Sequence, residues 1–173
     1  MEKNFFDKLE IGQVAETLIA RWLKKKGYSI LPVYEKEEQK IGGPVFHLVE
    51  RKVIAPDMLA MSETGKCFFV EAKNKNAFTW HRITERWTTG IDLSHYNDYL
   101  EIMRKIDIPI YLIFNHRGGT AKDSEKSDSG LFAQDLRYLR NNENHRCGPK
   151  PHCKNGMVFW SKDNLKRIGD ALC

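Results

Sequence analysis

The sequence lacks the features of membrane and secreted proteins. It contains no run of 18 apolar residues, which a membrane-spanning helix would need. Its first 13 residues, MEKNFFDKLEIGQ, alternate between acidic and basic side chains and hold no apolar signal core. Cysteine is scarce, and its four copies, at positions 67, 147, 153 and 173, form no obvious disulfide framework. We therefore expect a cytoplasmic protein in a reducing compartment.

The charge balance is only mildly basic. Lys and Arg number 28 against 23 Asp and Glu, which gives a net charge of +5 over 173 residues. Hydrophobic residues make up 41% and charged residues 29%, as in ordinary globular proteins. This length is sufficient for a sizeable core, and we expect residues 1–173 to form a single domain. The positive charge permits an anionic partner such as nucleic acid but does not require one.

Hydrophobic periodicity predicts an α/β fold with a mixed central β-sheet flanked by helices. The predicted helices are residues 8–26, 93–106, 131–142 and 161–172, the last with Ser161 as its N-cap. The predicted strands are residues 28–34, 44–54, 56–62, 66–73, 108–116 and 156–160. Residues 76–91 are expected to be irregular, and residues 117–130 a flexible loop.

The stretch IAPDMLAMSETGKCFFVEAKNK, residues 54–75, places charged side chains at the ends of two apolar strands. Side chains alternate faces along a strand, so Glu71 and Lys73 project from the same face. A turn centred on Thr64 and Gly65 brings Asp57, at the start of the other arm, roughly opposite Ala72. Two carboxylates, with the Ala72 carbonyl as a further ligand, suit a hard cation such as Mg²⁺, for which Mn²⁺ can substitute. Lys73 beside this cation would stabilise developing negative charge and help to orient a water.

These residues resemble the signature of the PD-(D/E)xK nuclease superfamily. The matching elements are Pro56-Asp57, thirteen intervening residues, and Glu71-Ala72-Lys73. The superfamily includes restriction endonucleases, archaeal-type Holliday junction resolvases and phage-encoded exonucleases, and the resemblance covers about residues 10–115. It implies a restriction-endonuclease-like core and metal-dependent hydrolysis of DNA phosphodiester bonds.

The predicted first helix adds a third acidic residue. GQVAETLIARWLKKKGYSIL resembles the resolvase-like opening, in which a helix carries one glutamate and ends at a glycine before the first strand. Glu16 matches that glutamate, so the resemblance implies Glu16, Asp57 and Glu71 as metal ligands and, with Lys73, as the catalytic set. The predicted helix that begins at Leu93 resembles the family helix that often carries Gln and Tyr near the site.

Candidate nucleic-acid contacts follow the motif directly. His95 stands where the family helix has Gln, and Tyr96 and Tyr99 lie nearby in the sequence. The basic and aromatic stretch between residues 75 and 87 would bind phosphates and stack on exposed bases. The candidates for nucleic-acid binding are Lys75, Arg82, Arg86, His95 and Tyr99.

Other interpretations remain open at this point. The three residues Asp57, Glu71 and Lys73 are also compatible with a salt bridge on a surface hairpin. The whole chain is also compatible with an RNA nuclease, a restriction-type enzyme or a non-catalytic nucleic-acid-binding module. His145, Cys147, His152 and Cys153 are zinc-type ligands, although adjacent ligands at 152 and 153 suit one tetrahedral ion poorly. Because no separate target-recognition domain is visible, we expect structure-directed or end-directed cutting of DNA; endonuclease or exonuclease action and a homodimer are left open.

Overall fold

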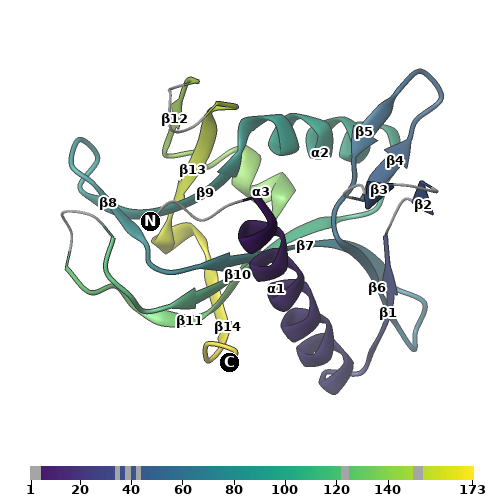
Figure 1. The fold of residues 1–173 in the computed structure, drawn as a ribbon, viewed down its shortest axis with the longest axis horizontal. Coiled ribbons are helices and arrows are strands. Elements are labelled where there is room, and N and C mark those ends of the chain that lie inside the picture. The colour runs from purple at the N-terminus through teal and green to yellow at the C-terminus, as the bar shows by residue number, and fades with distance from the viewer. Residues whose placement is uncertain (1–4, 34–35, 38–39, 42–43, 122–124, 150–153) are drawn as a thin grey trace.

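The structure is a computed structural model that describes residues 5–33, 36–37, 40–41, 44–121, 125–149 and 154–173. A six-stranded sheet crosses the molecule, and helix α1 (Phe5–Lys25) lies across one of its faces (Figure 1). Helix α2 (Leu93–Lys105), helix α3 (Leu136–Arg140) and a second, four-stranded sheet pack on the other face. The predicted mixed sheet flanked by helices is confirmed.

The main sheet has the strand order β1-β6-β7-β10-β11-β14. Strands β7 and β10 run parallel, and the other neighbours in this sheet are antiparallel. Its strands are β1 (Tyr28–Pro32), β6 (Met58–Ser62), β7 (Cys67–Lys75), β10 (Ile110–Arg117), β11 (Ser129–Asp135) and β14 (Lys166–Gly169).

The remaining strands form three smaller sheets. The second sheet has the order β12-β13-β9-β8, and the other two are short hairpins. These strands are β12 (His145–Cys147), β13 (Met157–Ser161), β9 (Arg86–Asp92), β8 (Thr79–His81), the pair β2 (Lys36–Glu37) and β3 (Lys40–Ile41), and the pair β4 (Val45–His47) and β5 (Lys52–Ile54).

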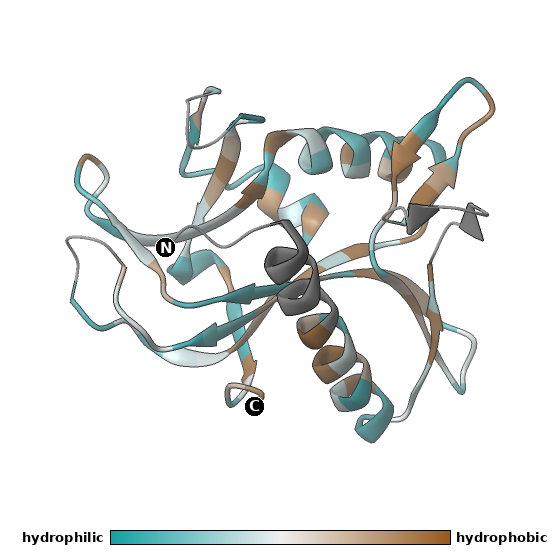
Figure 2. Cartoon of the chain, in the orientation of Figure 1, coloured by the Kyte–Doolittle hydropathy of each residue, from teal (hydrophilic) through white to brown (hydrophobic). Residues whose placement is uncertain are grey.

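Helix α1 covers the sheet with an apolar stripe. Ala15, Ile19 and Leu23 recur every four residues and are buried, because this spacing keeps them on one side of a helix. The helix ends at Lys25, and Gly27 adopts a positive φ of 88° just beyond it. Figure 2 shows hydrophobic and hydrophilic residues alternating along the described part of α1. The predicted helix over residues 8–26 is confirmed.

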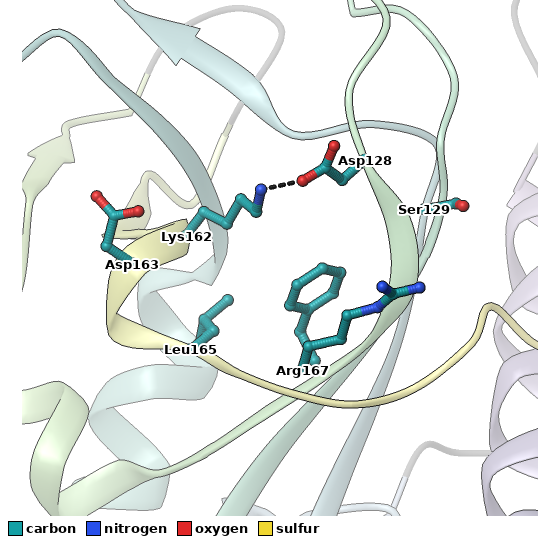
Figure 3. A pocket seen from close by; sticks show the side chains of 7 residues that line it. Asp128, Ser129, Lys162, Asp163, Leu165 and Arg167 are labelled. Carbon is teal, nitrogen blue, oxygen red and sulfur yellow. Dashed lines mark hydrogen bonds and ion pairs between the residues drawn. The ribbon is translucent and has the colours of Figure 1, made fainter.

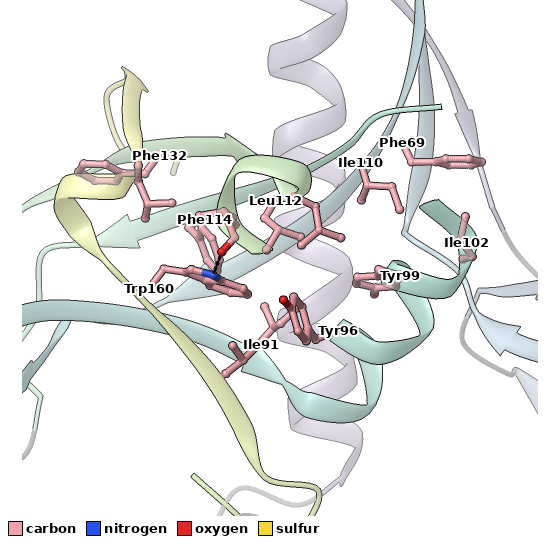
Figure 4. Close-up of a cluster of buried hydrophobic side chains, with 14 of the residues drawn as sticks. Phe69, Ile91, Tyr96, Tyr99, Ile102, Ile110, Leu112, Phe114, Phe132 and Trp160 are labelled. Atoms are coloured by element: carbon pink, nitrogen blue, oxygen red, sulfur yellow. Dashed lines mark hydrogen bonds between the residues drawn. The ribbon is translucent and has the colours of Figure 1, made fainter. Parts of the chain in front are cut away.

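The main sheet separates two apolar clusters. On the face that carries α1, called the α1 face here, Ile19 and Leu23 pack against Val70, Ala72 and other small or branched strand residues. On the opposite face, called the α2 face, aromatic side chains from β7, β10 and β11 meet α2, α3 and the second sheet (Figure 4). The indole of Trp160 is fully buried there and donates to the Leu139 carbonyl at 2.9 Å.

Strands β6 and β7 form the predicted hairpin. Ser62 N donates to the Lys66 carbonyl at 2.8 Å, and Gly65 supplies the positive φ of 79° that the turn requires. Along β7, Val70 and Ala72 contact the α1 face, so that Glu71 and Lys73 between them project toward the α2 face. This alternation places the charged pair beneath helix α2.

Four sequence-based assignments of secondary structure were wrong in part. Residues 76–91, expected to be irregular, form the hairpin of β8 and β9, and residues 44–54 form the β4–β5 hairpin where one strand was predicted. Residues 131–142 begin as strand β11 before the short helix α3, because the apolar run at Leu131 pairs with β10. Residues 161–172 form one 3₁₀ turn (Lys162–Asn164) and strand β14; Ser161 caps this turn, as predicted for a helix, by accepting from Asp163 N.

Among the residues that the structure describes, no helix is long and apolar enough to cross a membrane.

Candidate active site

Glu71 lies at the centre of the charged group on the α2 face. Its side chain is 1% exposed, and its two oxygens have different partners. Oε2 accepts a hydrogen bond of 2.5 Å from the Tyr99 hydroxyl, and Oε1 forms an ion pair with the Lys73 ammonium. Burial alone would raise the pKa of Glu71, but the Lys73 charge and the hydrogen bonds outweigh it and hold the pKa at about 2. Glu71 is therefore an ionised carboxylate in the interior.

Asp57 lies beside Glu71 at the open end of the hairpin. Met58 pairs with Val70, so continuing the register sets Asp57 opposite Glu71, one residue from the predicted partner Ala72. The side chain is 9% exposed, and Oδ2 accepts from Ala72 N at 2.7 Å. Burial and the negative charge of Glu71 raise the pKa of Asp57 to about 8, although Lys73 opposes them. The two carboxylates therefore resist being ionised together.

Lys73 compensates part of this negative charge. Burial lowers the pKa of its ammonium, but Glu71 and Asp57 more than offset this effect and raise the pKa above its ordinary value. The side chain remains 27% exposed, so that it bridges the buried carboxylate and the surface. Lys73 is thus a permanently charged donor beside two carboxylates at neutral pH.

Glu16 contributes from helix α1. Its side chain is partly buried, and its charge adds to the effects that raise the pKa of Asp57. Asp57, Glu71 and Lys73 therefore form one group, on which Glu16 acts electrostatically through Asp57. In the described ranges, however, no three His, Cys, Asp or Glu side chains converge closely enough to make a ready-formed metal site. The metal-ligand set of Glu16, Asp57 and Glu71 stays a prediction.

The donor chemistry of this group nevertheless suits a divalent cation. Carboxylate oxygens are the ligands that Mg²⁺ prefers, and one such ion can bind two adjacent carboxylates at once. The raised pKa of Asp57 reflects repulsion from Glu71 in addition to burial, and a bound cation would relieve that repulsion. These residues therefore fit a hard cation, which binds carboxylate oxygens. A soft cation would prefer thiolate or imidazole ligands.

The helix α2 supplies the aromatic and imidazole neighbours of Glu71. Tyr99 is 1% exposed and directs its hydroxyl to Glu71, so it orients this carboxylate. The sequence-based prediction that Tyr99 contacts nucleic acid does not agree with this burial. Tyr96 is also buried and donates to Glu143. His95 is 28% exposed, and its Nδ1 lies 3.9 Å from Glu71 Oε1, beyond hydrogen-bond distance. His95 therefore lies at the mouth of the site.

The predicted basic contacts fall into two places. Lys75 follows Lys73 on the same face of β7, and burial together with the Lys73 charge lowers its pKa to about 8. Arg82 and Arg86 are exposed on the β8–β9 hairpin, where Arg86 Nε lies 3.6 Å from an Asp163 carboxylate oxygen. Only Lys75 thus belongs to the immediate surroundings of Glu71.

The predicted zinc ligands are only partly described. His145 stacks between His81, with ring centroids 3.7 Å apart, and Phe159, with centroids 4.5 Å apart. Cys147 is a free, partly buried thiol on the same strand. His152 and Cys153 lie outside the described residues, so a zinc site at this position is still only a hypothesis.

A separate cavity of about 560 Å³ lies between β11, the 3₁₀ turn and β14 (Figure 3). Lys162 and Asp128 form an ion pair across its mouth, and the Arg167 guanidinium points toward Ser129. None of its lining residues belongs to the group around Glu71. The carboxylates therefore lie outside this cavity.

Sequence reasoning missed two contributions to the site. The sequence predicts that Tyr99 contacts DNA, whereas in the structure its hydroxyl binds Glu71. The sequence does not show which side of α2 faces the sheet. Asp92, the last residue of β9, acts electrostatically on both Lys73 and Lys75. From its place just before a helix, Asp92 would be expected to cap that helix, but its side chain makes no cap hydrogen bond, and its action on the two lysines depends on the pairing of distant strands.

The fold is similar to that of a solved nuclease. Hjc, a Holliday junction resolvase from the archaeal hyperthermophile Archaeoglobus fulgidus, matches with a TM-score of 0.53 and 8% sequence identity, over 91% of this chain and 96% of that chain. No family model matches the sequence, and no curated protein matches it. At this level of identity the likeness concerns the fold, and it bears out the predicted α/β core with a mixed central sheet.

Proposed function

We propose that the protein is a metal-dependent nuclease that hydrolyses DNA phosphodiester bonds in a structure-directed or end-directed manner. The observation that carries this proposal is the group of Asp57, Glu71 and Lys73 on a sheet of resolvase-like fold. A surface salt bridge would not explain it, because Glu71 is fully buried and Asp57 nearly so. Burying two carboxylates side by side is unfavourable unless a cation joins them.

Each residue has a distinct role in this proposal. Asp57 and Glu71, with Glu16 from α1, would hold Mg²⁺, or Mn²⁺ in its place. When bound, such an ion lowers the pKa of water and neutralises charge on a phosphate oxygen. Tyr99 fixes the orientation of the Glu71 carboxylate through its hydrogen bond.

Lys73 does not ligate the cation. Its side chain is 27% exposed and its ammonium stays charged, so Lys73 can approach a scissile phosphate from the protein surface. There it donates to the non-bridging oxygen on which negative charge accumulates. Lys75, next along the same face, adds a second cation along the path of the DNA backbone.

Cleavage assays test the proposal. Four-way junction, linear duplex, single-stranded DNA and RNA of matched sequence are incubated with the protein in Mg²⁺, in Mn²⁺ and in chelator. We expect metal-dependent cleavage of DNA that is strongest on branched or end-containing substrates. Asp57→Asn keeps the side-chain shape but cannot ionise to bind the cation, so it should lose cleavage while retaining the fold.

Two outcomes distinguish the remaining alternatives. Binding of DNA without cleavage in either metal would indicate a non-catalytic nucleic-acid-binding module. Preferential cleavage of RNA would indicate a ribonuclease built on the same residues. Activity that persists undiminished in chelator and in Asp57→Asn would contradict the assignment of the carboxylates.

A further inference from the structure

The hairpin of β8 and β9 is connected to the candidate active site at both of its ends. It follows β7, which ends at Lys75, and it leads into α2 through Asp92, whose charge acts on Lys73. At about 3.3 Å per residue, its turn lies up to roughly 26 Å from Asp92. Figure 1 shows this turn at one edge of the molecule, beyond the body of the two sheets. The hairpin is therefore an arm that extends outward from the site.

The turn of this arm presents an apolar residue to solvent. Ile83 is 88% exposed at the tip, with Arg82 beside it. Below the tip, Trp80 is 40% exposed and packs edge-on against Trp87, with ring centroids 5.5 Å apart. Within the described part of the chain, Arg82 makes no ion pair. An apolar tip, an aromatic pair and an unengaged cation thus occupy one protruding surface.

Several interactions hold the tip in a defined conformation. Thr84 Oγ1 lies 2.8 Å from His81 Nδ1 and donates to Asn144 Oδ1 at 3.0 Å. The His81 ring stacks on His145, with centroids 3.7 Å apart and planes 7° from parallel. Glu85 adopts a φ of 50°, which is uncommon for a residue other than glycine. The surrounding contacts therefore fix the turn and keep Ile83 in solvent.

The β4–β5 hairpin provides a comparison within the same chain. Val49 at its tip is fully exposed, like Ile83. Its neighbours, however, are bound to helix α2: Glu50 pairs with Lys105 and Arg51 pairs with Asp98. Below it, Phe46 of β4 packs edge-on against the buried Phe69, with ring centroids 6.1 Å apart. Exposure of one branched apolar residue is common, but of these two tips the β8–β9 tip combines it with an exposed tryptophan and with Arg82, which forms no ion pair with the described residues.

We propose that the tip of the β8–β9 hairpin is a second DNA-binding element, in which Ile83 packs against a base exposed at a branch or strand end and Arg82 and Arg86 bind adjoining phosphates. This inference rests on the proposed nuclease function and narrows its substrate to DNA with an interrupted base stack. Isoleucine carries no hydrogen-bonding group, so it cannot read base edges, but it can fill the space between unstacked bases. A continuous duplex offers no such space, whereas a junction does.

Binding measured in chelator tests the inference without cleavage. The probes are a four-way junction and a linear duplex of equal length, with fluorescence anisotropy as the readout. Ile83→Ser should weaken binding to the junction roughly tenfold, because one base–side-chain contact is lost, and should change duplex binding less than twofold. Val49→Ser is the matched control and should change neither.

A fluorescent base analogue at the branch point adds a second readout. The parent protein should increase its fluorescence by unstacking it, and Ile83→Ser should not, although both variants fold because the position is exposed. Thr84→Val removes the brace and keeps Ile83, so it should reduce the fluorescence change partially. Equal junction affinity and equal unstacking by the parent and Ile83→Ser would overturn the inference, as would equal affinity of the parent for junction and duplex.

Failure of the nuclease proposal would look different. A parent protein that binds junctions through Ile83 but cleaves none of them in Mg²⁺ or Mn²⁺ would refute catalysis and support the second binding element. A parent protein that cleaves in a metal-dependent manner with unchanged junction preference in Ile83→Ser would support catalysis and refute the element.

Discussion

The two faces of the main sheet bury different kinds of side chain near strand β7. On the α1 face, Ile19, Leu23, Val70 and Ile113 fill the space with aliphatic groups, and every one of them is buried. On the α2 face the same strand, β7, carries Glu71 and Lys73 into an environment of tyrosines. An apolar cluster and a buried charged group therefore lie on opposite sides of the same strand.

The difference shows which face limits stability and which limits chemistry. Burial of aliphatic surface is favourable by roughly 25 cal/mol per Å², with no partner required. Burial of the carboxylates is unfavourable; Lys73 and the hydrogen bonds outweigh it at Glu71, whereas at Asp57 burial and the Glu71 charge prevail. Changes to the aliphatic residues of the α1 face should thus alter the free energy of unfolding, and changes to the charged group on the α2 face should alter catalysis. Four experiments test this separation.

The largest expected effect is that of Glu71→Gln. Loss of the carboxylate charge should reduce the single-turnover rate of DNA cleavage by at least about 10³-fold, because the proposed cation loses a ligand. The fold should persist, since the pKa of Asp57 falls when its repulsive neighbour is gone and Asp57 can then pair with Lys73. Thermal unfolding in chelator provides the control. A cleavage rate near that of the parent would contradict the separation of roles.

Lys73→Ala should have a somewhat smaller effect. The ammonium is needed when negative charge develops, and removing one such donor costs about 10²–10³ in rate. Mg²⁺ binding, measured by calorimetry, should change little, because an ammonium is not a ligand. Lys73→Arg keeps the charge but alters its shape and reach, so it should recover activity poorly. Loss of metal affinity in Lys73→Ala as severe as in Asp57→Asn would make its role structural.

His116 gives the α2 face a further, pH-dependent contribution. The ring is fully buried between Phe78 and Phe132, neither nitrogen has a hydrogen-bond partner, and burial with the Lys75 charge lowers its pKa to about 3. Because the folded pKa lies below the ordinary value, the neutral ring contributes stability above about pH 6.5 that is lost as the pH falls toward 3. Between pH 6.5 and 5 the loss amounts to roughly 2 kcal/mol.

Urea unfolding at pH 7 and pH 5 in chelator measures this contribution. The stability of the parent relative to His116→Phe should fall by about 2 kcal/mol between the two values. The pKa of Asp57 is raised to about 8, so its protonation stabilises the fold as the pH falls from 8 toward 4, which is the opposite sign. That effect is common to both proteins and cancels in the difference. A difference independent of pH would mean that His116 titrates normally.

The smallest expected effect is that of Ile19→Val on the α1 face. Removing one methylene group from this buried site should lower the free energy of unfolding by about 0.5–1.5 kcal/mol. The cleavage rate of the folded protein should stay within twofold of the parent, since Ile19 packs in the aliphatic cluster of the α1 face. Urea unfolding and single-turnover cleavage on the same preparation check both halves. A tenfold loss of rate would show that the two faces are coupled.

The sequence predicted those elements whose periodicity is local. The spacing of Ala15, Ile19 and Leu23 identified helix α1, and the turn at Gly65 between two apolar arms identified the hairpin that carries Glu71. These features depend on contacts between residues close in the chain. The same local reasoning placed Glu71 and Lys73 on one face, which the structure confirms through their ion pair.

Errors arose where distant contacts override local preference. Residues 161–172 have a helix-compatible pattern and a good N-cap, but Lys166–Gly169 pairs with β11 instead and forms the sheet edge. The composition of the segment from Leu131 favours a helix, yet its first residues pair with β10 and form a strand. Tyr99 was misplaced for the same reason, because its partner Glu71 is 28 residues away.

The hairpin of β6 and β7 also determines the order in which the site can assemble. Asp57, Glu71 and Lys73 all belong to this one hairpin, and a hairpin of neighbouring strands closes within about 1–10 μs. The parallel contact of β7 with β10 requires residues 76–109 to loop back first, which is a slower, non-local event. We therefore expect the acidic pair to come together while water still surrounds it, and to lose this water when α2 docks and the Tyr99 hydroxyl contacts Glu71. On this expectation, folding meets the most unfavourable step of this site last, when the apolar contacts that offset it are already in place.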